Sequence, residues 1–154
     1  MEMPQLNEHH EKLAAMVGEW IGNETMHRSP WSPESASATS RTVARRELGG
    51  FFIISDYEQK RDGEVSYCGH GVFGWDPRKE QYTSHWYDTM DGDPGAPALG
   101  AWEGDTLCFQ HQHHMGHSRY TYVFSGKDAY TFALDFSRDG KEWIPFCDGK
   151  YTRA

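Results

Sequence analysis

Two histidines, His70 and His85, could do acid–base or ligand-binding chemistry on a predicted β-hairpin over residues 69–89. If residues 76–79 form the turn, Trp75 faces Glu80 and His70 lies directly opposite His85, because strand side chains alternate between faces. Two facing imidazoles could bind a ligand carboxylate or exchange a proton near neutral pH. Only one face of the hairpin can point into a cavity. The alternative to the histidine face is the opposite face, which carries Tyr67, Phe73, Trp75, Tyr82, Trp86 and Asp88.

A second histidine group surrounds the predicted turn at Met115 and Gly116. His111 and His113 share one face of a strand, a spacing that suits a pair of zinc ligands, and His117 after the turn could be a third. No carboxylate or cysteine stands at a fixed spacing beside them, which favours a polar hairpin tip. We therefore predict no metal and keep these three residues as the candidates for one.

Motifs for covalent or cofactor chemistry do not occur in the sequence. It lacks Gly-x-Ser-x-Gly, His-Glu-x-x-His and a phosphate-binding glycine loop. No histidine follows His117, so a haem ligand on a late strand is missing. We predict no cofactor, and a binding protein rather than an enzyme.

Aromatic residues recur at alternating positions on the later strands and could wall a cavity. Such pockets are mostly apolar, with few converging polar groups. The same rings could instead fill a core or form a protein-contact surface. The candidate ligand-binding residues are His70, His85, Trp86, Tyr120, Tyr122 and Phe132.

Length and charge limit the class of protein. The 154 residues suit a single domain over 1–154, and the net charge of −8 argues against nucleic acid and anionic membrane surfaces as partners. No secretion signal and no apolar run of about 20 residues are visible, which predicts a cytoplasmic protein without membrane insertion. The three cysteines lack C-x-x-C spacing and are expected to be reduced thiols.

The order of elements predicts an all-β fold. Asn7 can cap a short helix that runs to about Val17. Glycine, proline and aspartate turns then separate about ten antiparallel strands at a spacing typical of a sandwich or barrel. Outside the hairpin, the predicted strands cover 20–28, 38–48, 51–59, 99–102, 106–114, 117–125, 129–137 and 143–153.

The two ends of the chain favour the barrel. A helix followed by Gly18-x-Trp20, with Arg153 in the last strand, resembles the lipocalin and fatty-acid-binding superfamily. This resemblance implies that Trp20 closes one barrel end beneath Arg153, forming a structural seal. The chain also resembles a bacterial family of lipocalin-like barrels whose function is uncharacterised, a domain-of-unknown-function family. The stretches that carry this likeness are 10–20, 48–52, 74–88 and 151–153.

We therefore expect a closed antiparallel lipocalin-like barrel of about ten strands with a short N-terminal helix. The expected function is binding of a small, mostly apolar molecule, hydrophobic or aromatic, inside the barrel, with Arg or His side chains supplying the polar contacts. Two alternatives remain: a small-molecule enzyme with an acid–base cluster in the barrel, or a homodimeric interaction module.

Overall fold

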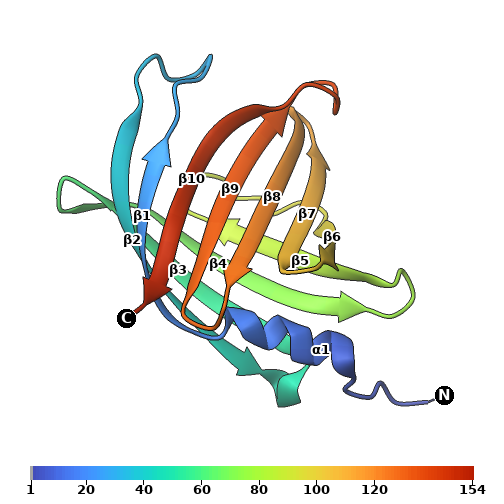
Figure 1. Ribbon diagram of the computed structural model, residues 1–154. Helices are drawn as coiled ribbons and strands as arrows, with labels where there is room; N and C mark the ends of the chain where they lie inside the picture. The colour runs from blue at the N-terminus through green and yellow to red at the C-terminus, as the bar shows by residue number, and fades with distance from the viewer. Residues whose placement is uncertain (1) are drawn as a thin grey trace.

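Alternation of inward and outward side chains along short strands gives the chain a closed antiparallel barrel (Figure 1). The computed structural model describes residues 2–154. Its strands are β1 (Gly18–Met26), β2 (Ala36–Glu47), β3 (Phe52–Arg61), β4 (Glu64–Asp76), β5 (Gln81–Asp88), β6 (Ala98–Glu103), β7 (Thr106–His113), β8 (Gly116–Ser125), β9 (Ala129–Ser137) and β10 (Ile144–Arg153). A short 3₁₀ segment, η2 (Leu48–Gly50), joins β2 to β3.

Each strand pairs with its neighbour in sequence, and β1 pairs with β10 to close the sheet. The closing register places Trp20 opposite Arg153 and Gly22 opposite Tyr151. Closure gives every strand a paired neighbour on each side, although β5 and β6 pair over only three residue pairs. The prediction of a ten-stranded lipocalin-like barrel with a short N-terminal helix is confirmed.

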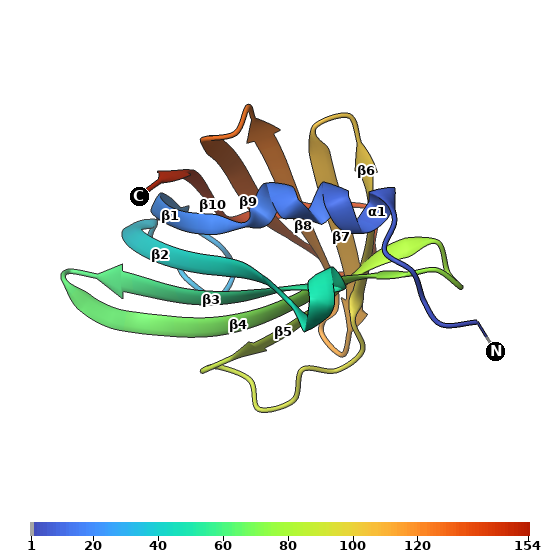
Figure 2. The ribbon, with the colours of Figure 1, turned by 90° about the horizontal axis from the view of Figure 1, so that it is seen from below.

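The N-terminal helix covers one opening of the barrel, as Figure 2 shows from below. α1 (Glu8–Lys12) continues into the 3₁₀ turn η1 (Leu13–Met16). Asn7 caps the helix as predicted: its side chain accepts a hydrogen bond from the backbone N–H of His9 at 2.9 Å. The inner side of the segment buries Leu13 and Met16 in the same apolar cluster as Trp20.

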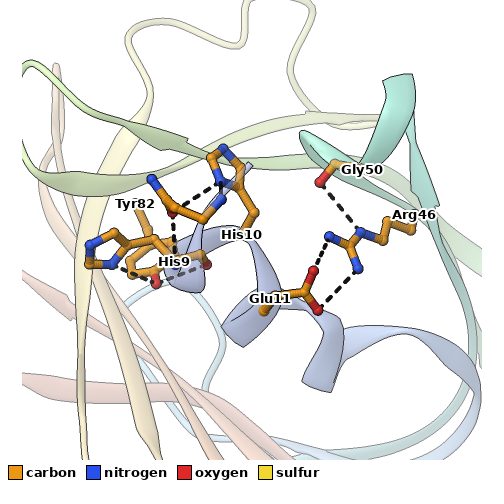
Figure 3. A network of polar contacts seen from close by, with 7 residues as sticks. His9, His10, Glu11, Arg46, Gly50 and Tyr82 are labelled. Atoms are coloured by element: carbon orange, nitrogen blue, oxygen red, sulfur yellow. Dashed lines mark hydrogen bonds and ion pairs between the residues drawn. The ribbon is translucent and has the colours of Figure 1, made fainter. Parts of the chain in front are cut away.

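Polar contacts fix this helix to the barrel wall (Figure 3). The Arg46 guanidinium at the end of β2 donates to Glu11 at 2.8 Å and to the Gly50 carbonyl at 3.4 Å. On the other side, the Tyr82 hydroxyl donates to the carbonyl of His9 at 3.0 Å. The helix-covered end of the barrel is therefore held from two strands.

The register of the β4–β5 hairpin differs from the predicted one. Asp76 pairs with Gln81 rather than standing inside the turn, so Trp75 faces Tyr82 and His70 faces Tyr87. The Asp76 carboxylate accepts hydrogen bonds from two turn N–H groups, at 2.9 and 3.3 Å, and the four-residue loop lies at residues 77–80, one residue later than predicted. The pairing register is shifted by an even number of residues, so each side chain keeps its predicted face.

None of the helices within residues 2–154 is both long and apolar enough to cross a membrane. Cys68, Cys108 and Cys147 are free thiols.

Candidate functional site

The barrel interior has two unlike halves. At the helix-covered end most inward side chains are tightly packed and lose almost all contact with solvent. This packed half contains Leu13, Trp20, Ile53, Phe73, Leu107 and Phe109, each 0–1% exposed except Phe73 at 2%. At the opposite end one group of inward side chains is only half-buried, namely Tyr57, Tyr67, Trp86, Asp88, Tyr120, Leu134 and Cys147. Solvent therefore reaches the second set, which we call the open half.

Glycines let an aromatic ring lie along the wall of the open half. A Cβ built at Gly69 would come within 2.0 Å of the Trp86 indole, and one at Gly71 would come within 3.1 Å. Gly69 and Gly71 on β4 therefore leave the space that the indole of Trp86 on β5 occupies. The indole N–H donates to the Tyr67 hydroxyl at 2.7 Å, and that hydroxyl donates to Asp88 at 2.8 Å.

A buried carboxylate, Glu24 on β1, forms the second polar group of the interior. It is 7% exposed and points inward in phase with Trp20 and Gly22. Tyr57 donates to it at 2.7 Å, the Gln59 amide donates at 3.1 Å, and the Tyr151 hydroxyl donates from β10. Three neutral groups therefore donate to one buried side chain, which accepts all three hydrogen bonds.

The Tyr151 ring reaches Glu24 because the wall around it carries glycine. A Cβ at Gly22 would lie 2.3 Å from the ring, and a Cβ at Gly149 would lie 2.5 Å from the hydroxyl. Ser40 points inward beside Gly22, is 6% exposed, and its hydroxyl has no hydrogen-bond partner within residues 2–154. A hydroxyl buried in this way lacks the partner that buried polar groups usually have.

The aromatic donors to Glu24 and Asp88 contact one another. Tyr57, which donates to Glu24, lies with its ring centroid 5.9 Å from that of Tyr67 and 6.0 Å from that of Trp86. Burial, followed by the charge of Glu24, raises the pKa of Tyr57. Burial also raises the pKa of Tyr67. Both phenols therefore stay protonated and act as donors to the carboxylates.

These acids form no ion pair in the part of the chain that the structure describes, although Lys60 and Lys150 line the same cleft as Glu24. Neither Glu24 nor Asp88 forms an ion pair with a lysine, arginine or histidine there. A buried charge is costly unless it is paired and hydrogen-bonded, and here only the hydrogen bonds are present. The interior is therefore aromatic and negatively charged.

The aromatic residues predicted for the ligand site all point inward. Trp86 and Tyr120 lie in the open half, while Tyr122 and Phe132 stand lower, with ring centroids 4.9 Å apart, against the packed half. These four residues come from β5, β8 and β9 and face the same interior.

The two predicted histidines lie elsewhere. His70 and His85 sit on the outer face of the hairpin, and the expected pairing between them is wrong, since His70 faces Tyr87 and His85 faces Val72. His70 forms a hydrogen bond with Asp56 at 2.7 Å across the outer surface. The interior goes instead to the aromatic face, because Gly69 and Gly71 make room there for Trp86. An interior acid–base cluster built on these histidines is thus not formed.

Trp20 and Arg153 meet at the packed end. The Arg153 guanidinium carbon lies 4.4 Å from the centroid of the indole, and the group donates to the carbonyls of Lys127 and Val17 at 2.8 and 2.9 Å. Trp20 is 1% exposed and its N–H donates to the carbonyl of Met16 at 3.0 Å. The pair joins the first strand, the last strand and the segment beneath them.

The other histidine group is divided between the two faces. His111 and His113 point inward at the rim, with ring centroids 5.6 Å apart, whereas His117 points outward against Gly140. His113 bonds the Ser118 hydroxyl at 2.9 Å. Within residues 2–154, no three His, Cys, Asp or Glu side chains are grouped so as to hold a metal ion.

The sequence reasoning did not find Glu24, Tyr57, Gln59 and Tyr151. The phase of β1 was the available signal, because residues 20, 22 and 24 share one face and Trp20 was already placed inside. The donors come from β3 and β10, and only the register of the closed sheet shows that they converge.

Comparison with known proteins agrees with this architecture. Residues 5–153 match the family described as a protein of unknown function, DUF1579. The chain belongs to the DUF1579 family. No curated protein matches it.

Two solved structures share the fold of this DUF1579 chain. Rv2717c from M. tuberculosis is 13% identical, with a TM-score of 0.71, and the alignment covers 97% of this chain and 99% of that one. The S-type phycobiliprotein lyase CPES from Guillardia theta is 12% identical, with a TM-score of 0.68 and 98% of each chain covered. Both are similar in fold along nearly their whole length.

Proposed function

We propose that the protein binds a small, mostly apolar molecule in the open half of its barrel. One observation carries this proposal: the inward rings of Tyr57, Tyr67, Trp86 and Tyr120 in the open half keep contact with solvent, whereas those of Trp20, Phe73 and Phe109 in the packed half do not. Barrels of about eight strands are already wide enough to hold one small ligand, and this barrel has ten.

The wall between β5 and β6 supports access to this interior. The two strands pair over only three residue pairs, from Tyr82–Gly100 to Ser84–Ala98. The second half of β5, which carries Trp86 and Asp88, has no partner on that side within residues 2–154. The connection over residues 89–97 follows this gap, so the edge of β5 beside Trp86 is not covered by strand pairing.

A neutral fluorescent probe tests the proposal. N-phenyl-1-naphthylamine should bind saturably, with enhanced emission, because its rings leave water for an apolar pocket. L134W places an indole inside the open half, opposite Tyr120, and should abolish this binding. V123W adds the same group on the outer face of β8 and should leave binding unchanged.

Melting temperatures of both variants show whether the barrel is intact. Absence of saturable binding to the wild type, or equal binding to wild type and a folded L134W, would contradict the proposal. Native mass spectrometry of freshly purified protein then reports the mass of any ligand acquired in the cell, together with subunit number.

The structure favours no enzyme built on His70 or His85, because both side chains point away from the interior. The polar groups that face the proposed ligand are acids and phenols, with the imidazoles of His111 and His113 at the rim.

A further inference from the structure

We infer that the ligand carries a positive charge beside its planar apolar part, and that Glu24 and Asp88 select for that charge. This inference rests on the proposed function and names the class of ligand: an aromatic molecule with an ammonium, iminium or comparable cationic nitrogen.

The first support is the lack of a counter-ion for Glu24. Glu24 is only 7% exposed, and its donors Tyr57, Gln59 and Tyr151 are all neutral. Hydrogen bonds from neutral groups fill the acceptor positions of the carboxylate but bring no positive charge to it. The low dielectric of the interior makes the carboxylate charge act more strongly on a bound molecule than that of a surface carboxylate would.

A second acid faces the same space. Asp88 accepts from Tyr67 at 2.8 Å, and its other oxygen accepts from the N–H groups of Met90 and Asp91 at 2.9 and 2.8 Å. These donors too are neutral. Asp88 is half-buried, so a ligand in the open half can approach it.

The rings near the two acids suit a cationic aromatic guest. The ring centroid of Tyr57 lies 5.9 Å from that of Tyr67 and 6.0 Å from that of Trp86. Tyr57 donates to Glu24, and Tyr67 donates to Asp88. Faces of tyrosine and tryptophan attract a cation through the ring quadrupole, and this attraction grows when water is excluded. Aromatic walls and acidic groups therefore favour the same ligand chemistry.

The unpartnered hydroxyl of Ser40 is an independent sign that the interior is incomplete by itself. Its oxygen is buried on the inner face of β2, one pair of residues from Glu24 along the sheet, and finds no partner within residues 2–154. A hydrogen-bonding group on the ligand, directly or through water, would satisfy it.

Two dyes of similar size and opposite charge test the inference. Thioflavin T is a planar cation and 1-anilinonaphthalene-8-sulfonate is an anion, and both emit more strongly in apolar sites. We expect thioflavin T to bind at least about tenfold more tightly than the anion. E24Q and D88N should each weaken thioflavin T by about fivefold or more, while binding of neutral N-phenyl-1-naphthylamine stays within about twofold.

The matched control is E58Q, which removes one negative charge from the outer face of the same β3 that carries Tyr57 and Gln59. It should leave thioflavin T binding unchanged. Gln is isosteric with Glu, and melting temperatures identify any variant that unfolds. Y151F tests the Glu24 carboxylate in a second way, because it removes the Tyr151 hydroxyl that donates to it.

Equal or tighter binding of the anion, or equal effects of E24Q and E58Q, would overturn the inference. If the neutral probe still binds in that case, the ligand site stands and only the charge preference is wrong. If the neutral probe also fails to bind, the proposed function itself is wrong.

Discussion

The indole of Trp86 occupies the space that a side chain at Gly69 would fill: a Cβ built there would lie 2.0 Å from the ring. This relationship between neighbouring strands decides which face of the β4–β5 hairpin turns inward. The bulky side chain of one strand fits only over the bare backbone of the other, so the wall of the open half depends on both residues.

Substitution G69A should displace the Trp86 indole and weaken its hydrogen bond to Tyr67. We expect a loss of about 1–3 kcal/mol in the free energy of unfolding, typical of overpacking, and weaker binding of the neutral probe. Near-ultraviolet circular dichroism and urea denaturation measure these effects. G92A is the control, because a Cβ at Gly92 would meet nothing within 4 Å. Unchanged spectra and stability in G69A would contradict this packing.

Arg153 should contribute to stability through four separate contacts, one of which is an ion pair with exposed Asp128 at 3.3 Å. R153A removes the guanidinium that lies over Trp20 and its hydrogen bonds to the Lys127 and Val17 carbonyls. A cation over an indole and charged hydrogen bonds at a partly exposed site together suggest a loss of about 2–3 kcal/mol in the free energy of unfolding.

R153K is the informative comparison for Arg153. It keeps the charge but not the planar fork, so it should lose an intermediate amount of stability in urea denaturation. If R153A costs less than about 0.5 kcal/mol, within the range of ordinary surface substitutions, the contact with Trp20 does not stabilise the barrel end.

The overall fold could be predicted from the sequence because its signals are local. Turn residues separate the strands, Asn7 marks the helix start, and Trp20 and Arg153 mark the two strands that close the barrel. Parity also assigned Trp86 and His70 to opposite faces of the hairpin despite the error in register, since a shift by an even number preserves faces.

The polar part of the site could not be predicted in the same way. Glu24 meets Tyr57 and Tyr151 across 33 and 127 residues of sequence, and no local pattern links three residues so far apart. Which hairpin face points inward was open for a different reason, because both faces carry plausible ligand groups. Gly69 and Gly71, on the same face as Trp86, were the signal that distinguishes them.

The outer-face contact of Asp56 should make stability depend on acid pH. Hydrogen bonds from Arg45 first and His70 second hold the pKa of Asp56 below its ordinary 3.8. A depressed folded pKa stabilises the protein above the unfolded value, and this contribution is lost as the pH falls through the folded value. The stability difference between wild type and D56N should therefore shrink below about pH 3.8.

The size of this effect is small. The Asp56 side chain is 54% exposed, so solvent screens the contact and we expect less than about 1 kcal/mol at neutral pH. Urea denaturation between about pH 2.5 and 7 measures the difference, with E34Q as a control, because exposed Glu34 forms no ion pair within the described residues 2–154. A difference that grows on acidification would contradict the assignment.

Cys147 offers a chemical probe of the charge at Glu24. Burial first and the charge of Glu24 second raise the pKa of this inward thiol to about 12. Since the thiolate is the reactive form, Cys147 should react slowly with iodoacetamide at about pH 8.5. E24Q removes the neighbouring negative charge, so it should lower the thiol pKa and speed alkylation by about threefold to tenfold.

The experiment needs a C68S/C108S background, so that only Cys147 reacts. A loosened barrel would also speed alkylation, but lowering of the thiol pKa has a distinct signature: the pH–rate profile moves to lower pH. E58Q, which removes a charge from the outer face, should leave both rate and profile unchanged. An unshifted profile in E24Q would mean that the carboxylate does not act on the interior as a charge, and the preference for a cationic ligand would lose its physical basis.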